Sequence, residues 1–191
     1  MNICVYGAAS KLIDDRYITA GEQLGALLAC HGHDLIFGGG AHGMMGALAR
    51  GVHEGGGDVI SVAPSFFNID GTLYEACTEY VYTDTMRERK QIMEDRSDAF
   101  IVTPGGVGTF EEFFEIFTLR QLGRHQKPIA VYNIDGYYDA MLAMLRSAVD
   151  GGFMNRSNLS LFCISDDAER ILSYIENFSA DTADIARLRN L

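Results

Sequence analysis

The residues with the clearest chemical potential lie between Thr103 and Glu112, in the segment TPGGVGTFEE. The apolar run at residues 99–102 comes before it and predicts a buried strand, and the amphipathic run from Phe110 to Leu122 comes after it and predicts a helix. Glycines at a strand-to-helix junction leave backbone N–H groups free at the positive end of the helix, where they can bind a phosphate. A carboxylate in the first turn of that helix, Glu112, suggests chemistry on a phosphorylated small molecule.

Two interpretations of Glu112 stay open at this point. Thr109 and Glu112 have the Thr-x-x-Glu spacing of a capping box, in which Glu112 would only accept the N–H of Thr109. Alternatively, the carboxylate acts as a base or stabilises a cation. A change to Gln separates the two, because Gln can still cap the helix but cannot act as a base. The nearby phenylalanines are expected in the core rather than in a base-stacking platform: Phe110, Phe113, Phe114 and Phe117.

Two further segments are candidates for ligand binding. The segment GGGAHGMMG at residues 38–46 follows a predicted strand, and we expect Gly39, Gly43 and Met44 to contribute to substrate binding, with close helix–sheet packing as the alternative. The loop that begins at Gly7 is a weaker candidate. A predicted helix at residues 85–96 carries cations in its first turns, where the helix dipole favours acids, and this placement favours function over a merely solvated face.

The elements that must position these residues alternate between short apolar runs and helical patterns. We expect strands at residues 3–6, 34–37, 58–63, 79–82, 99–102, 128–132 and 161–164, and helices at 17–30, 43–54, 85–96, 110–122, 137–149 and 168–178. This alternation predicts an α/β fold, a single-domain, Rossmann-like, doubly wound parallel sheet flanked by helices. The domain is expected to span residues 1–178, with a loop of little regular structure near 65–77 and a C-terminal tail at 179–191.

Composition narrows the classes of function. The chain of 191 residues has a formal net charge of −11, which repels nucleic acid and anionic membranes, so neither is an expected partner. The four cysteines are scattered, without a CxxC pair, and this pattern favours a reducing compartment, here the cytoplasm. No metal constellation is expected among the five histidines, and His31 and His33, which flank a glycine, are expected in a solvated loop.

Together these motifs resemble the LOG ("Lonely Guy") family of phosphoribohydrolases, earlier labelled lysine decarboxylases. The family pattern PGGxGTxxE matches residues 104–112, its GGGxxGLMG segment matches 38–46, and its Arg-Lys pair matches Arg89 and Lys90, with Arg89 lying 23 residues before Glu112. Further matches lie at residues 133–138 and 152–153, and the resemblance extends to about residue 175. The chain departs from the family at Gly7-Ala8-Ala9, where members carry Gly-Ser-Ser, and at residues 65–79.

The resemblance implies hydrolysis of the N-glycosidic bond of a nucleoside 5′-monophosphate, a cytokinin nucleotide or AMP, to free base and ribose 5-phosphate. It implies that Arg89 and Glu112 are catalytic, that no cofactor or metal is needed, and that the protein is a homodimer. The implied substrate-binding positions here are Lys90, Gly105, Gly106, Val107, Gly108, Thr109 and Thr118. Two alternatives remain: a non-catalytic nucleotide sensor or carrier of the same fold, and a pyridoxal-phosphate decarboxylase, for which Lys11, Lys90 and Lys127 offer no convincing Schiff-base residue.

Overall fold

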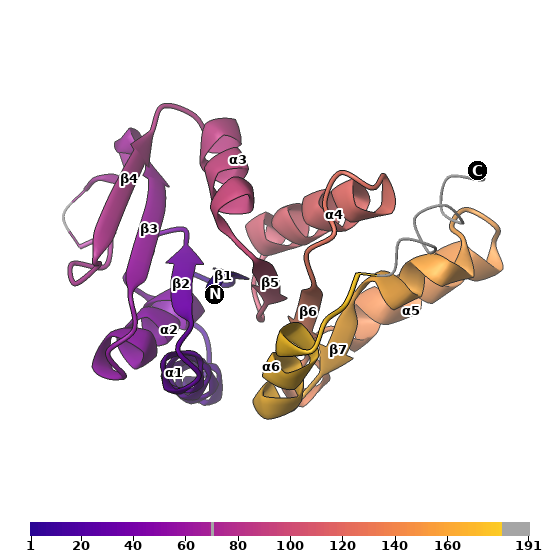
Figure 1. The fold of residues 1–191 in the computed structure, drawn as a ribbon, viewed down its shortest axis with the longest axis horizontal. Helices are drawn as coiled ribbons and strands as arrows, with labels where there is room; N and C mark the ends of the chain where they lie inside the picture. Colours follow the sequence, from indigo (N-terminus) through magenta and orange to yellow (C-terminus); the bar gives the residue numbers. More distant parts are fainter. Residues whose placement is uncertain (70, 181–191) are drawn as a thin grey trace.

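The computed structural model describes residues 1–69 and 71–180, and its centre is a seven-stranded sheet (Figure 1). The strand order is β4-β3-β2-β1-β5-β6-β7, and every neighbouring pair is parallel. The strands span Asn2–Tyr6 (β1), Asp34–Phe37 (β2), Val59–Pro64 (β3), Glu79–Thr83 (β4), Ala99–Val102 (β5), Ile129–Tyr132 (β6) and Cys163–Ser165 (β7). Because the chain builds outward from β1 on one side and then from β5 on the other, the loops after these two strands diverge and open a crevice at the carboxyl edge.

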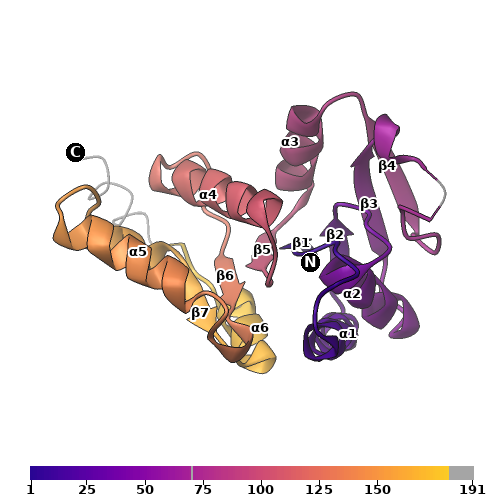
Figure 2. The ribbon, with the colours of Figure 1, turned by 180° about the vertical axis from the view of Figure 1, so that it is seen from behind.

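Helices cover both faces of the sheet, as Figures 1 and 2 show from opposite sides. Side chains of α1, α2 and α6 pack on one face, and those of α3, α4 and α5 pack on the other. The helices span Asp15–Cys30 (α1), Gly43–Glu54 (α2), Met86–Arg96 (α3), Val107–Gln121 (α4), Asp139–Asp150 (α5) and Ala168–Glu176 (α6). This arrangement confirms the predicted doubly wound α/β fold.

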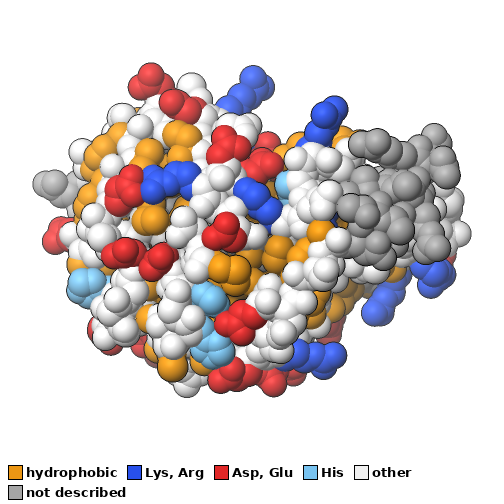
Figure 3. Space-filling model, in the orientation of Figure 1, with side chains coloured by type: hydrophobic (Ala, Val, Ile, Leu, Met, Phe, Trp, Pro, Cys, Tyr) orange, Lys and Arg blue, Asp and Glu red, His pale blue; other side chains and the backbone are white. Residues whose placement is uncertain are grey.

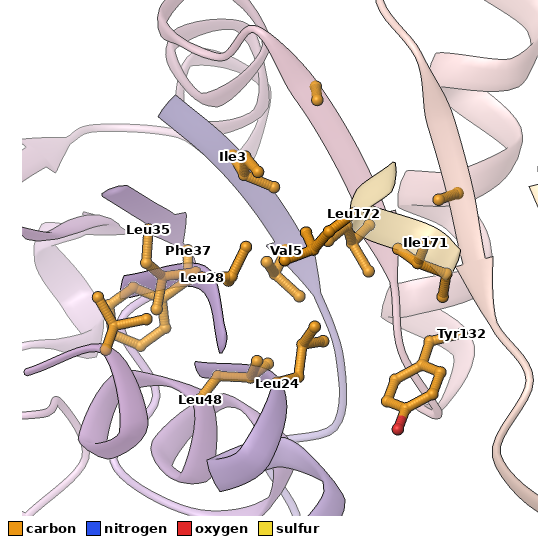
Figure 4. Close-up of a cluster of buried hydrophobic side chains, with 14 of the residues drawn as sticks. Ile3, Val5, Leu24, Leu28, Leu35, Phe37, Leu48, Tyr132, Ile171 and Leu172 are labelled. Atoms are coloured by element: carbon orange, nitrogen blue, oxygen red, sulfur yellow. The ribbon is translucent and has the colours of Figure 1, made fainter. Parts of the chain in front are cut away.

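The strands are apolar on both sides because both faces of the sheet are covered. On β1, Ile3 and Val5 point into the core under α1, α2 and α6, whereas Cys4 and Tyr6 point into the core under α3, α4 and α5. Figure 4 shows the first of these cores, where Leu24 of α1 and Leu172 of α6 lie on either side of Val5. This packing on both faces holds the central strands in place, and it therefore also positions the loops at their carboxyl ends.

The predicted elements are confirmed, with ends that shift by a few residues. The largest shift that matters is at α4, which begins at Val107 rather than Phe110, because Gly106 takes an extended conformation and acts as the N-cap. At α3 the predicted capping residue Thr85 accepts the N–H of Glu88 at 3.1 Å, and the Glu88 carboxylate accepts the N–H of Asp84 at 2.9 Å. Two of the four phenylalanines of α4, Phe113 and Phe117, are buried in the core as expected.

The expectation of a solvated loop is wrong for His33, whereas His31 is exposed in the turn after α1, as expected. His33 is 6% exposed, and both imidazoles contact the Glu176 carboxylate, at 2.8 Å from His31 Nδ1 and 2.9 Å from His33 Nε2. Glu176 is 145 residues from His31 in sequence, so the local pattern around the histidines could not indicate this contact. The two histidines and the acid form a cluster between the α1–β2 turn and the end of α6.

The segment between β3 and β4 has little regular structure, as expected. A 3-10 turn spans Ser65–Phe67, and Leu73 forms an isolated bridge with Gly40 beyond β2. Helix α6 ends at Glu176, and residues 181–191 of the predicted tail lie outside the described residues. Within the described part of the chain, no helix has the length and apolar character needed to cross a membrane.

Candidate active site

A hollow of about 250 Å³ lies at the carboxyl edge of the sheet, where the loops after β1 and β5 diverge. The residues that line it come from the loops after β1, β2 and β3 and from helices α2, α3 and α4. Its walls are formed by Gly7, Ala8, Ala9, Gly38, Met45, Phe67, Met86, Arg89, Gly106, Gly108, Thr109 and Glu112. The topological switch point therefore brings together segments that are far apart in the sequence, which is the usual position of a ligand site in this fold.

One wall of the hollow is the N-terminus of α4. The first bond of the helix runs from the N–H of Phe110 to the carbonyl of Gly106, at 3.1 Å. Among the described residues, no hydrogen bond uses the N–H groups of residues 106–109. A Cβ atom placed on Gly106 or Gly108 would meet nothing within 4 Å, so these amides are open to a ligand. Free amides and the helix dipole together make this wall a site for an anion.

Two tyrosines hold the loop that leads into α4. The Tyr138 hydroxyl donates to the carbonyl of Thr103 at 2.7 Å, and the Tyr137 hydroxyl donates to the carbonyl of Gly105 at 2.6 Å. Tyr138 is 1% exposed, so its bond lies in the core under the loop. Both tyrosines lie in the segment at 133–138 that resembles the family, but their supporting role is visible only in the structure, because it depends on contacts more than 30 residues apart in the chain.

A buried ion pair forms another part of the wall. Arg89 of α3 donates from Nη1 to Oε1 of Glu112 on α4 at 2.9 Å, and from Nε to the carbonyl of Val62 at 3.1 Å. Arg89 is 6% exposed and Glu112 is 8% exposed. The capping-box interpretation of Glu112 is wrong: Thr109 is the third residue of a helix that starts at Val107, and the Glu112 carboxylate binds Arg89 from the second turn.

The environment of Glu112 changes its acidity. Burial raises the pKa of the Glu112 carboxyl above its usual value, and the charge and hydrogen bond of Arg89 act in the opposite direction without cancelling the rise. A carboxylate with a raised pKa is a better proton acceptor near neutral pH, and in a site of low polarity its charge acts strongly on a nearby cation. The pair can therefore supply a negative charge, a base, or both.

The backbone after β2 passes very close to the guanidinium. A Cβ atom on Gly38 would lie 2.0 Å from Nη2 of Arg89, so only glycine leaves room for the arginine in this position. Nη2 donates to no protein atom among the described residues, and both Gly38 and Arg89 line the hollow. This nitrogen is free to donate to a ligand.

The structure corrects the expectation that Gly39, Gly43 and Met44, in the segment at residues 38–46, bind the substrate. Met44 is fully buried in the core, and it is the next residue, Met45, that lines the hollow. Gly39 has φ of 82° and Gly43 has φ of 61°, and a Cβ on Gly43 would lie 2.6 Å from the carbonyl oxygen of Ala8. Neither glycine lines the hollow, so both serve the turn and its packing.

Two residues suggested by the resemblance lie away from the hollow. Lys90 follows Arg89 on α3, but its ammonium group pairs with Glu111 and with Glu115, the latter at 2.7 Å. Thr118 is exposed on α4 and is not among the residues that line the hollow. The remaining predicted positions are at the α4 N-terminus, where Gly106, Gly108 and Thr109 line the hollow, Gly105 is buried beneath them, and the Val107 side chain is 85% exposed.

A second hollow, of about 380 Å³, adjoins the first. It shares Ala9, Gly38, Met45 and Phe67 with the first hollow and continues between the segment after β2 and residues 71–73. His42 lies on its wall, and Nε2 of this histidine is 3.0 Å from the carbonyl oxygen of Gly71. The two hollows together extend from the N-terminus of α4 to the segment that carries Leu73.

Comparison with known proteins gives matches along nearly the whole chain. A family model described as "Possible lysine decarboxylase" matches residues 45–175. The cytokinin riboside 5′-monophosphate phosphoribohydrolase LOG2 of Arabidopsis thaliana is 36% identical over 92% of this chain and 83% of its own length. Among solved structures, the structural-genomics target TM1055 has a TM-score of 0.72 at 20% identity, covering 93% of this chain and 99% of that chain. The molybdenum cofactor binding protein of Rippkaea orientalis has a TM-score of 0.66 at 20% identity, covering 92% and 93%. These two structures share the fold.

Proposed function

This chain belongs to the LOG family of phosphoribohydrolases, hydrolases that act on N-glycosyl compounds, and we propose on that basis that it cleaves nucleoside 5′-monophosphates. The products are the free base and ribose 5-phosphate. The relatives are named for cytokinin riboside 5′-monophosphates, and we propose both a cytokinin nucleotide and AMP as substrates. The observation that carries the proposal is the buried Arg89–Glu112 pair in the same hollow as the free amides of α4.

The 5′-phosphate of the substrate binds at the start of α4. The amides of residues 106–109 and the helix dipole supply donors and positive potential, although the chain as a whole is acidic. Glu112 lies five residues beyond Val107, which is an axial rise of about 7.5 Å, comparable with the length of a ribose 5-phosphate. Binding energy from the phosphate thus places the sugar beside the Glu112 carboxylate.

Glu112 acts on the positive charge that develops during cleavage. When the bond between the anomeric carbon and the base breaks, the base leaves with the electron pair and the ribose ring gains oxocarbenium character. The Glu112 carboxylate stabilises this charge and orients a water molecule, whose oxygen bonds to the anomeric carbon. One proton of the water passes to the carboxylate and finally to the departing base, so that charge and atoms balance.

Arg89 positions the carboxylate and contacts the substrate. Its bonds to Val62 and Glu112 fix the guanidinium between β3 and α4, and the free Nη2 donates to a ribose hydroxyl or a phosphate oxygen. The adjoining hollow beside Leu73 receives the base and any substituent on it.

The test is release of base from AMP and from a panel of nucleoside monophosphates. We expect Glu112→Gln to lower the turnover number by a factor of about 100 or more, because a positioned acid–base or electrostatic group commonly contributes this much. Glu115→Gln is the matched control, since Glu115 is on the same helix, is exposed and pairs with Lys90. Equal turnover by the two variants would refute the role of Glu112.

The same assay separates the enzyme from its alternatives. A carrier or sensor of the same fold would bind AMP and return it intact, so recovery of unchanged AMP after prolonged incubation would favour that alternative. A pyridoxal-phosphate decarboxylase needs a lysine that forms a Schiff base with the cofactor. All three lysines lie among the described residues: none lines the first hollow, and Lys11 lines the second, so Lys11→Ala, which should leave base release intact, tests that alternative. We further propose a cytoplasmic homodimer, and analytical ultracentrifugation tests the dimer.

A further inference from the structure

The cluster of His31, His33 and Glu176 lies at the edge of the sheet opposite the hollow. His31 caps the C-terminus of α1, His33 directly precedes β2, and Glu176 is the last residue of α6. Figure 3 shows histidine side chains beside acidic ones between α1 and α6, on the face seen in Figure 1. Because β2 starts here and α6 ends here, the cluster lies at the amino edge of the parallel sheet, whereas the hollow lies at the carboxyl edge.

We propose that His31, His33 and Glu176 form a binding site for a transition-metal ion of the zinc type. One ligand atom from each residue lies within 4.8 Å of the other two, so one ion can reach all three. Two imidazoles and one carboxylate are a donor set that zinc accepts readily, whereas magnesium and calcium prefer oxygen donors alone.

The contacts are close to those that an ion requires. His31 Nδ1 and His33 Nε2 lie 2.8 and 2.9 Å from Oε1 of Glu176, so both rings already direct a nitrogen at the same carboxylate. Ligand atoms around tetrahedral zinc, with bonds of about 2.0–2.2 Å, are roughly 3.3 Å apart. To bind the ion, each ring nitrogen must move about half an ångström away from Oε1, and the two nitrogens, which lie within 4.8 Å of each other, must reach a similar separation from one another. The ion then replaces the two hydrogen bonds.

The other ring nitrogens of the two histidines face opposite charges, and the Met1 ammonium, 3.5 Å from Nδ1 of His33, must turn aside when that ring binds zinc through Nε2. The other ring nitrogen of His31, Nε2, lies 3.7 Å from Oε2 of Glu169, close to the arrangement in which a second carboxylate orients a metal-bound histidine. The His33 side chain is 8% exposed and is held in place, while the side chains of His31 and Glu176 are 30% and 32% exposed. The partly open side admits the ion and leaves a fourth position for water.

The proposed ion has a structural role. It would join the turn between α1 and β2 to the end of α6, two segments that otherwise meet through packing and these hydrogen bonds. An ion that binds the folded chain only raises its thermal stability by mass action. For a chain of this size, zinc at 100 times its dissociation constant should raise Tm by about 5–10 °C.

The experiment is a titration of the full chain, freed of metal with a chelator, with zinc chloride alone. We expect calorimetry to give one site per chain with micromolar affinity, and Co²⁺ to give the visible absorption of a tetrahedral site. His31→Gln and Glu176→Gln should each weaken binding at least tenfold and abolish the rise in Tm. The matched control is His53→Gln, an exposed histidine at the end of α2, which should bind as the unchanged chain does.

Three results would overturn the proposal. The first is zinc affinity that His31→Gln and Glu176→Gln leave unchanged. The second is binding only at millimolar zinc with no fixed stoichiometry. The third is the absence of zinc binding by the unchanged chain together with a lower Tm of the Glu176→Gln variant. That result would mean that the cluster stabilises the fold through its hydrogen bonds alone. Circular dichroism of each variant verifies that loss of binding is not loss of fold.

Discussion

Replacement of Arg89 by methionine tests whether the buried pair is organised as the structure indicates. Methionine keeps much of the volume of the arginine stem but leaves the Glu112 carboxylate, which is 8% exposed, without the cation that contacts it at 2.9 Å. Removing one partner of a buried pair costs about 3–5 kcal/mol, because a buried charge remains uncompensated. A chain of this size loses about 2–4 °C in Tm per kcal/mol, so we expect a fall of about 6–20 °C at neutral pH.

The pH dependence of this loss has a definite sign. Without Arg89, whose charge and hydrogen bond both lower it, the pKa of Glu112 rises further in the folded state. A carboxyl whose pKa is higher when folded destabilises the protein as the pH rises above its unfolded value, so the Arg89→Met variant should regain stability on acidification. The double variant with Glu112→Gln should be more stable at neutral pH than Arg89→Met alone, with a coupling energy of about 2 kcal/mol or more.

The assay is thermal unfolding of the four proteins of this double-mutant cycle at pH 7 and pH 5. Additive losses of stability, or a loss in Arg89→Met that does not depend on pH, would show that the two side chains are not coupled as a buried ion pair. Either outcome would refute the reasoning about Glu112, including its raised pKa.

Three other predictions follow from the site. Activity at limiting substrate should fall as the pH drops through the raised pKa of Glu112, and this acidic limb should be missing from the residual activity of Glu112→Gln; a limb that persists unchanged in the variant contradicts the assignment. Gly108→Ala should keep its Tm, because the new Cβ meets nothing within 4 Å, but should raise KM severalfold by crowding the anion; an unchanged KM would argue against phosphate binding there. Tyr138→Phe should lower the free energy of unfolding by about 1–3 kcal/mol, because the buried Thr103 carbonyl loses its donor, whereas the exposed Tyr137→Phe should cost less in urea titrations; equal costs would contradict the inference.

The sequence predicts the order and type of the elements well, because buried parallel strands are short apolar runs and the helices have clear periodicity. It places the start of α4 three residues late, at Phe110 instead of Val107, because the glycines before Phe110 show no hydrophobic periodicity. That shift alone decides the role of Glu112, because a helix beginning at Val107 removes the capping-box geometry.

Neighbouring residues of similar type are harder to assign. Arg89 and Lys90 are adjacent on α3, and the helical turn of about 100° between them sends one into the hollow and the other to Glu111 and Glu115. Met44 and Met45 differ in the same way, and a single sequence does not say which of the two faces the core. Contacts between distant segments, such as those of Glu176 with the histidines, depend on the whole fold.

The most direct test of the central claim is a crystal structure of the Glu112→Gln protein with AMP bound. We expect the phosphate on the amides of residues 106–109 and the side chain of residue 112 within about 3.5 Å of the anomeric carbon or of a water aimed at it. A nucleotide that binds with its phosphate elsewhere, or with residue 112 turned from the sugar, would contradict the account.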